Sequence, residues 1–286
     1  MTNKCLVLAL HGGAGPLRGR DYAREKAHMT GLIEAGRDRL LAGAGALDVV
    51  VETVAALEAS GFYVAGRGAS PNRAGRYELD AGLMSGPGRR AGAVTALTGF
   101  ASPIRAALAV MTQTPHVLLA GDGAAGFAGD QGLERITDPA AWFTPAWRDT
   151  SAGVGTVGCV CRDETGALAA GTSTGGVFDK FPGRVGDSPI PGAGVWADDH
   201  VAVSCTGTGE MFIRAAVGAQ ISFRIQFAGE DLTTAARAAL ADVAHLGGEG
   251  GLIAISADGS VAMPYNSQGM KRAALHADGS IHCGVL

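Results

Sequence analysis

The sequence has few charged side chains and only a small excess of one sign. Aspartate, glutamate, lysine and arginine make up 17% of the 286 residues, against about 25% in an average globular protein, and the net charge is -4. Basic residues are scattered along the chain, so the electrostatic footprint of a nucleic-acid-binding protein is missing. No stretch of about 18 uncharged apolar residues occurs, and we therefore expect no membrane-spanning helix.

Cysteine is scarce and lacks the spacing of a metal site or a disulfide framework. The chain has five cysteines, an odd number, and no two of them form a Cys-x-x-Cys pair. Cys159 and Cys161 alternate within an apolar run, where thiols act as small buried hydrophobic groups. The apolar run from Cys5 to Leu10 is too short for the core of a signal peptide. We therefore expect no zinc site, no disulfides and a reducing, cytoplasmic compartment.

Hydrophobic residues and glycine are abundant. Hydrophobic residues make up 47% of the chain, which is enough for a sizeable core and excludes disorder. Glycine accounts for 45 of the 286 residues, against an average share of about 7%, and follows no Gly-X-Y repeat. The composition excludes collagen and indicates a compact fold with many tight turns and close backbone contacts.

Apolar spacing predicts a mixture of strands and helices within a single domain of residues 1–286. Short apolar runs predict strands at 5–10, 77–84, 91–97, 116–120 (a buried one), 251–256 and 260–264. Apolar residues three and four apart predict helices at 21–42, 46–59, 103–112, 210–225 and 232–244. Both periodicities fade between about 132 and 155, which we interpret as an exposed linker.

A Gly-x-Gly-x-x-Gly match at Gly121–Gly126 raises the possibility of a nucleotide-binding module. The match follows an apolar run, as a dinucleotide fingerprint does, but that run is only about five residues long. No second parallel strand follows with the expected acidic residue, because the chain enters the predicted linker. A structural turn that opens a helix is therefore the favoured interpretation, and nucleotide binding stays an alternative.

A Gly-x-Ser-x-Gly match, Gly171 to Gly175, raises the alternative of a serine hydrolase with Ser173 as nucleophile. That motif requires a strand, a sharp turn and then a helix. The residues after Gly175 include Gly176, Pro182 and Gly183, which is not a helical sequence. The serine hydrolase is therefore kept as an alternative only.

The segment from Thr156 to Thr174 predicts a β-hairpin. Asp163 and Ala167 flank a three-residue loop whose last member, Gly166, suits a left-handed conformation. In that register the numbers of paired residues sum to 330, so Thr156 faces Thr174 with the Cβ atoms about 5 Å apart. The pair is either two functional hydroxyls beside the linker or an ordinary cross-strand threonine pair.

Two later segments carry polar groups suited to a small zwitterion. Arg184 and Asp187 could bind the carboxylate and the ammonium of an α-amino acid, or form a local surface ion pair. Thr206 and the N–H of Gly207 stand at a predicted helix entrance and could stabilise an oxyanion. A plain helix cap is the alternative there, and Thr208 could provide it.

These motifs together give the chain a resemblance to a known family. Four segments carry it, in order along nearly the whole chain: His11–Gly15, Gly155–Gly158, Gly183–Pro189 and Thr206–Glu210. The chain resembles the N-terminal-nucleophile amidohydrolases of the plant-type asparaginase and isoaspartyl peptidase family. That resemblance implies an α+β fold, a four-layer αββα sandwich, and a dimer of cleaved heterodimers acting on small β-aspartyl amides without a cofactor.

The resemblance also implies roles for individual residues. The chain would cut itself between Gly155 and Thr156 into 1–155 and 156–286, and the freed amine of Thr156 would activate its own hydroxyl as the nucleophile. Thr174 would orient that hydroxyl. The remaining groups would be the oxyanion hole of Thr206 and the Gly207 N–H, Arg184 for the substrate carboxylate, and Asp187 with the Gly209 carbonyl for its amine.

Three segments depart from the family pattern. The family's Asn-Ala-Gly-x-Gly-Ser loop appears as Val64–Ala69, so a hydrogen-bonding side chain is missing and ordinary asparaginase activity is put in question. Residues 70–76 differ from the sodium-binding loop of some members, and we expect no metal. Residues 189–199 resemble the glycosylasparaginase branch, whose specificity is the alternative to isoaspartyl dipeptides and L-asparagine.

Overall fold

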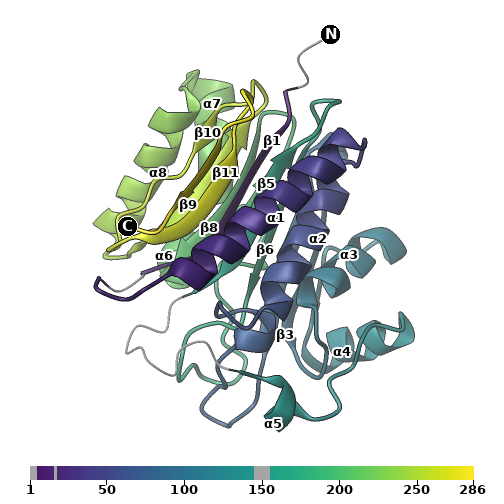
Figure 1. The fold of residues 1–286 in the computed structure, drawn as a ribbon. Helices are drawn as coiled ribbons and strands as arrows, with labels where there is room; N and C mark the ends of the chain where they lie inside the picture. Colours follow the sequence, from purple (N-terminus) through teal and green to yellow (C-terminus); the bar gives the residue numbers. More distant parts are fainter. Residues whose placement is uncertain (1–4, 16–17, 145–154) are drawn as a thin grey trace.

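The computed structural model describes residues 5–15, 18–144 and 155–286, and within them the strands form two sheets (Figure 1). The larger sheet has the strand order β12-β11-β1-β5-β6-β2-β3-β4, and the smaller has the order β10-β9-β8-β7. Neighbouring strands are antiparallel except β3 and β4, which are parallel.

The strands and helices have the following bounds. The larger sheet contains β1 (Val7–Ala14), β2 (Leu79–Ser85), β3 (Arg90–Leu97), β4 (Leu118–Ala120), β5 (Val157–Arg162), β6 (Leu168–Thr174), β11 (Met270–Leu275) and β12 (Ile281–Gly284). The smaller contains β7 (Val195–Ala197), β8 (Val201–Gly207), β9 (Gly250–Ser256) and β10 (Val261–Ala262). The helices are α1 (Ala23–Leu41), α2 (Ala46–Ala59), α3 (Pro103–Gln113), α4 (Gly121–Asp130), α5 (Pro139–Trp142), α6 (Gly209–Ala215), α7 (Val217–Ala228) and α8 (Leu232–His245), with short 3-10 turns at Gly66–Gly68 and Pro87–Arg89.

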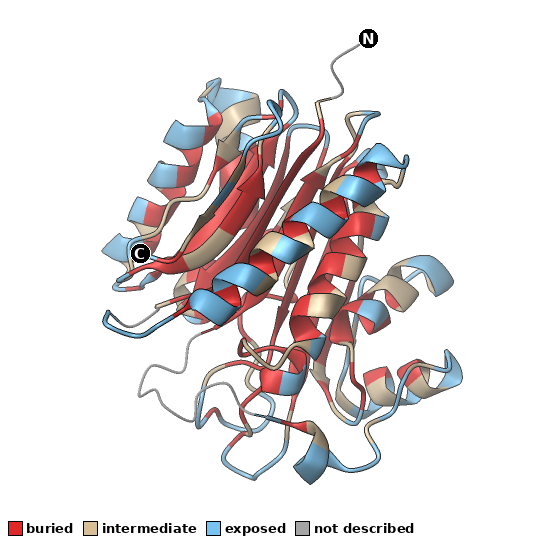
Figure 2. Cartoon of the chain, viewed as in Figure 1, coloured by how far each residue is buried: buried red, intermediate tan, exposed pale blue. Residues whose placement is uncertain are grey.

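The two sheets pack face to face between two groups of helices. Helices α1, α2 and α3 pack on one face of the larger sheet, and the smaller sheet packs on its other face. Helices α6, α7 and α8 pack on the smaller sheet. The central strands are therefore buried on both sides, and Figure 2 shows them in red between helices whose outer faces are exposed.

The central strands read as continuous apolar runs because both of their faces are covered. In β1, Leu8 and Leu10 pack with the helices, whereas Val7 and Ala9 pack toward the smaller sheet. The same alternation puts Cys159 in the layer next to the helices and Val160 between the sheets. This period of two decides which polar residues at the strand ends can meet.

Most predicted elements are confirmed, and several differ from the prediction in their bounds or burial. Strand β1 continues beyond its predicted end at residue 10 to Ala14, with an irregularity in its pairing between His11 and Ala14. The strand predicted at 116–120 is β4, of three residues, and is not buried. The helix predicted at 210–225 is broken at Ala216, whose φ of 48° is left-handed, so that α6 and α7 are separate helices.

The predicted linker at about 132–155 is described as far as residue 144, and most of those residues are exposed. Its first part contains α5 and a buried side chain, Phe143, whose ring stacks on Tyr77 with 3.7 Å between ring centroids. Residues 145–154 lie outside the described residues. No helix in the described part of the chain is long and apolar enough to span a bilayer.

Candidate active site

The hairpin of β5 and β6 has the predicted register. Val157 pairs with Ser173 and Gly158 pairs with Thr172, and both pairs of numbers sum to 330. The turn closes with a hydrogen bond from the Asp163 N–H to the Ala167 carbonyl at 3.1 Å, and Gly166 has a left-handed φ of 86°. This register brings Thr156 and Thr174 together at the open end of the hairpin.

The hydroxyls of Thr156 and Thr174 are hydrogen bonded to each other. Thr156 Oγ1 donates to Thr174 Oγ1 at 3.2 Å, and the N–H of Gly176 donates to the same Thr174 oxygen at 2.9 Å. Both threonines are buried. The Thr156 hydroxyl is thus held in one orientation by a neighbour that is itself fixed by the backbone.

Ser173 points away from this pair. Because side chains alternate along β6, Ser173 faces the helices, where its hydroxyl donates to Glu58 Oε1 at 2.6 Å. Ser173 is fully buried within a strand rather than exposed on a turn. The serine hydrolase alternative was therefore wrong.

Thr206 and Gly207 end β8, the strand of the smaller sheet that leads into α6. Thr206 Oγ1 accepts a hydrogen bond from the Ala14 N–H at 3.1 Å, so its own hydrogen remains available for a further acceptor. Thr208 occupies the N-cap position of α6, but its hydroxyl donates to the Glu249 carbonyl at 3.2 Å instead of capping the helix.

Arg184, Asp187 and Gly209 lie together. A Cβ added at Gly209 would lie 3.0 Å from Asp187 Oδ1 and 3.1 Å from an Arg184 guanidinium nitrogen, so a larger residue there would crowd both groups. Arg184 does not pair with Asp187 as a local surface ion pair; its fork holds both carboxylate oxygens of Glu210 at 2.9 Å. Sequence reasoning missed Glu210, although it ends one of the four motif segments.

Asp187 is a buried carboxyl with spare hydrogen-bonding capacity. Its side chain is 3% exposed, and within the described residues Oδ2 has no hydrogen-bond partner. Burial raises the pKa of this carboxyl from 3.8 to about 7, against the opposing effect of the nearby Arg184 charge. Such a group favours a cationic partner, because an ammonium would satisfy the free oxygen and stabilise the ionised form.

The junction between Gly155 and Thr156 is tightly enclosed. A Cβ at Gly13, whose φ is 99°, would lie 2.7 Å from the Cα of Gly155. A Cβ at Gly155 would lie 2.9 Å from Val64 Cγ2. Glycine is therefore required on both sides of the contact, and Val64 meets the junction with methyl groups where the family loop has an amide.

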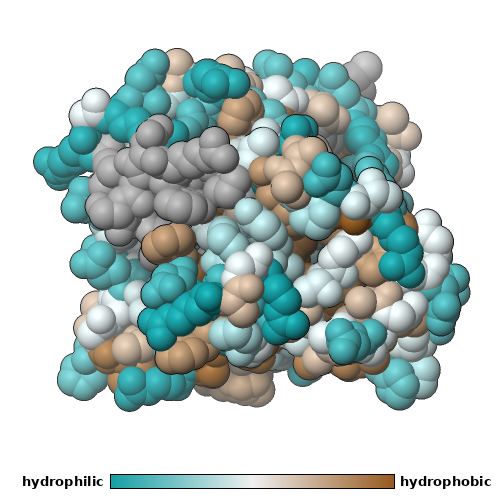
Figure 3. Space-filling view, turned by 90° about the horizontal axis from the view of Figure 1, so that it is seen from below, coloured by the Kyte–Doolittle hydropathy of each residue, from teal (hydrophilic) through white to brown (hydrophobic). Residues whose placement is uncertain are grey.

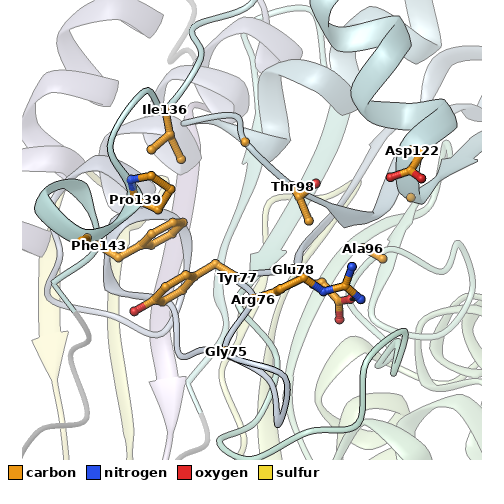
Figure 4. Close-up of a pocket in the computed structure, with 13 residues that line it drawn as sticks. Gly75, Arg76, Tyr77, Glu78, Ala96, Thr98, Asp122, Ile136, Pro139 and Phe143 are labelled. Carbon is orange, nitrogen blue, oxygen red and sulfur yellow. Dashed lines mark ion pairs between the residues drawn. The ribbon is translucent and has the colours of Figure 1, made fainter.

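A cavity of about 690 Å³ lies elsewhere, and its lining includes none of the predicted catalytic residues (Figure 4). Figure 4 shows the stacked rings of Tyr77 and Phe143 on one side and Asp122 across the cavity. It lies near the end of the molecule that carries α5, where Figure 3 shows polar and apolar side chains mixed on the surface. Gly121 also lines it but begins α4 directly, so the turn that opens a helix is confirmed.

Comparison with known proteins agrees with this arrangement of side chains. A family model described as Asparaginase matches residues 4–149 and 142–285, which together span nearly the whole chain. The chain belongs to the asparaginase family. The family resemblance inferred from the four motif segments is thereby confirmed, and with it a mixed fold of helices and strands.

Similar proteins in the family are named isoaspartyl peptidase, L-asparaginase, or both. An isoaspartyl peptidase of Salmonella typhimurium is 43% identical over 93% of this chain and 94% of its own length. A plant-type L-asparaginase of Pyrobaculum calidifontis is 39% identical over 93% and 95%. A human isoaspartyl peptidase/L-asparaginase is 36% identical over 98% and 96%.

Proposed function

We propose that the chain is a self-processing amidohydrolase that hydrolyses β-aspartyl amides, namely isoaspartyl dipeptides and L-asparagine. The observation that carries the proposal is the Thr156–Thr174 hydroxyl pair, which lies directly beside the enclosed Gly155 junction. The names of the relatives support the substrate class, and the grouping of Arg184, Asp187 and Gly209 supports recognition of an α-amino acid.

The fold proposed for the chain is the four-layer αββα sandwich of the N-terminal-nucleophile hydrolases. Two facing sheets between two groups of helices support this assignment. The chain is then a single domain of residues 1–286 that becomes two pieces, 1–155 and 156–286. Strands of the two pieces are interleaved in the larger sheet, where β1 pairs with β11 and β5 and β2 pairs with β6, so the pieces stay associated after the cut.

Processing begins with attack of Thr156 Oγ1 on the Gly155 carbonyl carbon. The C–N bond between Gly155 and Thr156 breaks as an ester to Oγ1 forms, and the proton of the hydroxyl ends on the released amine. Water then hydrolyses the ester, leaving a carboxylate on Gly155 and restoring the hydroxyl. Glycine at this position keeps the attacked carbonyl accessible under Val64.

Hydrolysis of the substrate reuses the same hydroxyl. The α-amine of Thr156, with an ordinary pKa of about 8, removes the hydroxyl proton as Oγ1 attacks the side-chain amide carbon. The Thr206 hydroxyl and the Gly207 N–H donate to the developing oxyanion, and Thr174 orients the nucleophile. The amine leaving group takes the proton, and water releases the β-aspartyl group from its ester with Thr156.

Substrate is held through the charges of its α-carbon. Arg184 binds the α-carboxylate with its planar fork, and Asp187 and the Gly209 carbonyl accept from the α-ammonium. Two features of Asp187 support this role: its buried Oδ2 has no hydrogen-bond partner within the described residues, and its Oδ1 lies toward Gly209. A carboxylate that enters the fork of Arg184 must displace Glu210, which now occupies it.

The proposed enzyme needs no metal or cofactor and works as a dimer of cleaved heterodimers. All five cysteines are free thiols, which supports a reducing compartment such as the cytoplasm. A glycosylasparaginase-like specificity within the same family is the alternative substrate assignment.

The test is the intact mass of freshly purified and aged protein, followed by a substrate panel. We expect two fragments that meet at Gly155 and Thr156, and hydrolysis of isoaspartyl dipeptides, L-asparagine or glycosylated asparagine by the cleaved protein. Thr156→Ala should remain uncut and inactive, whereas Ser173→Ala should be cut and active. Hydrolysis by uncut Thr156→Ala protein would contradict the proposal.

A further inference from the structure

A buried histidine contacts the backbone carbonyl of the proposed nucleophile residue. His11 stands in β1, has no exposed surface, and faces the space between the sheets. Its Nδ1 lies 3.1 Å from the carbonyl oxygen of Thr156, and its Nε2 lies 3.0 Å from Ser204 Oγ in the smaller sheet. The imidazole thus bridges the two sheets beside the proposed active site.

Further hydroxyls extend this bridge. Ser204 Oγ lies 2.7 Å from Thr172 Oγ1, which in turn lies 3.0 Å from the carbonyl oxygen of Gly194. The Gly194 N–H donates to the Asp187 carbonyl at 3.1 Å. Polar contacts therefore run without a break from Thr156 to the loop that carries the proposed ammonium ligand.

Counting hydrogens gives the bridge a direction. The Thr156 carbonyl can only accept, so the proton of a neutral His11 must be on Nδ1, and Nε2 must accept from Ser204. The Ser204 oxygen can then accept from Thr172. If Thr172 donates to Ser204, the Gly194 carbonyl still has a hydrogen-bond donor, because it accepts from the Cys205 N–H at 2.9 Å. The hydrogens of His11 and Ser204 therefore point toward Thr156, and Thr172 has a single hydrogen for its two neighbours, Ser204 Oγ and the Gly194 carbonyl.

The bridge lies against Gly158, a position with no room for a side chain. Gly158 is the cross-strand neighbour of His11 on one side and of Thr172 on the other. A Cβ at Gly158 would lie 1.9 Å from Ser204 Oγ and 2.5 Å from His11 Nε2. The His11–Ser204 hydrogen bond therefore packs directly against the backbone of Gly158, and any side chain there would displace it.

We propose that neutral His11, oriented by Ser204 and Thr172, is a positioning residue that fixes the Thr156 carbonyl and thereby the direction of the nucleophilic hydroxyl and amine. This inference rests on the proposed function. His11 belongs to the 1–155 piece and Thr156 to the 156–286 piece, so the contact also holds the new N-terminus in place after cleavage. Burial, with a smaller effect of the Lys271 charge, lowers the pKa of His11 to about 3, which agrees with a neutral ring.

The kinetic test compares two amide replacements of His11. In His11→Asn the side-chain amide reaches the place of Nδ1 and can still donate to the Thr156 carbonyl, whereas in His11→Gln it reaches the place of Nε2 and cannot. We expect His11→Gln and His11→Leu to lower kcat on an isoaspartyl dipeptide about tenfold, with KM within about twofold, and His11→Asn to recover most of the loss.

A second pair of variants makes only small changes in shape. Ser204→Ala removes the donor to Nε2 and should lower kcat by about threefold to tenfold, at unchanged KM. Ser173→Ala removes an equally buried hydroxyl from the opposite face of β6, outside the bridge, and should match wild type. Should the His11 variants fail to fold, this pair still decides. Equal kcat in Ser204→Ala and Ser173→Ala, or equal losses in His11→Asn and His11→Gln, would overturn the inference.

A spectroscopic test needs no activity. In ¹⁵N spectra of histidine-labelled protein, the signals lost in His11→Asn should show the Nδ1–H tautomer and should not titrate between pH 5 and 9. An Nε2–H tautomer, or titration near 6.5, would overturn the inference even in an active enzyme. If wild-type protein neither cuts itself nor hydrolyses the dipeptide, the proposed function fails instead, and the tautomer still tests the bridge.

Discussion

Replacing Asp187 with asparagine is expected to stabilise the folded protein at alkaline pH while weakening substrate binding. The carboxyl is buried with one oxygen unpartnered, and its pKa is raised from 3.8 to about 7. Because the folded state keeps a proton that the unfolded state has already released, the free energy of unfolding falls as the pH rises from about 4 to about 7. Asparagine is of nearly the same size and does not titrate.

The size of the effect follows from those two pKa values. For a group with a pKa of 3.8 unfolded and about 7 folded, the loss of unfolding free energy between pH 5 and pH 8 is about 2.5 kcal/mol. Other buried groups, such as Glu58 and His11, contribute equally to both proteins, so they cancel in the difference. The difference in unfolding free energy between Asp187→Asn and its parent should therefore grow by about that amount from pH 5 to pH 8, with the variant the more stable.

The assay is urea unfolding at pH 5 and pH 8, with every protein carrying Thr156→Ala so that a single uncut chain is compared. Asp199→Asn is the matched control, because it removes an exposed aspartate and should show no widening. In the cleavable background, Asp187→Asn should raise KM at least tenfold. A difference in unfolding free energy that stays constant with pH, or that grows toward pH 5, would refute the interpretation of Asp187 as a buried carboxyl with a raised pKa that binds a cationic group.

Three further predictions concern the binding of the substrate carboxylate by Arg184 and the junction between Gly155 and Thr156. Arg184→Ala should raise KM for an isoaspartyl dipeptide about tenfold to a hundredfold while leaving the rate of self-cleavage, followed by intact mass, within about twofold of wild type; a change confined to kcat would contradict its role. Glu210→Gln should lower KM about threefold, because the fork of Arg184 is then free for the substrate; a higher KM would mean that Glu210 orients Arg184. Gly13→Ala should slow self-cleavage at least tenfold, because φ is 99° and the Cβ would lie 2.7 Å from the Cα of Gly155; cleavage at the wild-type rate would show that the junction tolerates displacement.

Local rules were sufficient for the hairpin and for the position of Thr156. A three-residue loop ending in Gly166 determines the pairing, and the pairing brings Thr156 to Thr174. The same rules failed where tertiary packing decides. The glycine-rich segment after His11 reads as a loop, yet it extends β1, because Ala14 pairs with Met270 and donates to Thr206 of the other sheet.

Alternation along β6 explains why Thr174 lies at the proposed active site whereas Ser173, in the Gly171–Gly175 motif match, does not. If Thr174 faces Thr156 between the sheets, then Ser173 must face the helices, and a buried strand residue hydrogen bonded to Glu58 is not a nucleophile on a sharp turn. This step requires the hairpin register alone, so the serine hydrolase could have been excluded from the sequence. The partner of Arg184 could not, because the choice between Asp187 and Glu210 depends on how a loop meets the start of α6.

The bridge through His11 marks the limit of what strand patterns reveal. Register relates His11 to Gly158 and Gly158 to Thr172 within the larger sheet, and alternation sends both polar side chains toward the facing sheet. Neither rule says which residue of the smaller sheet lies opposite, and Ser204 is opposite only because β8 is aligned so that Thr206 reaches the Ala14 N–H. A glycine near the start of a central strand, such as Gly158 between His11 and Thr172, is nevertheless a readable signal, because it leaves space for a third polar group that completes the hydrogen bonds of its neighbours.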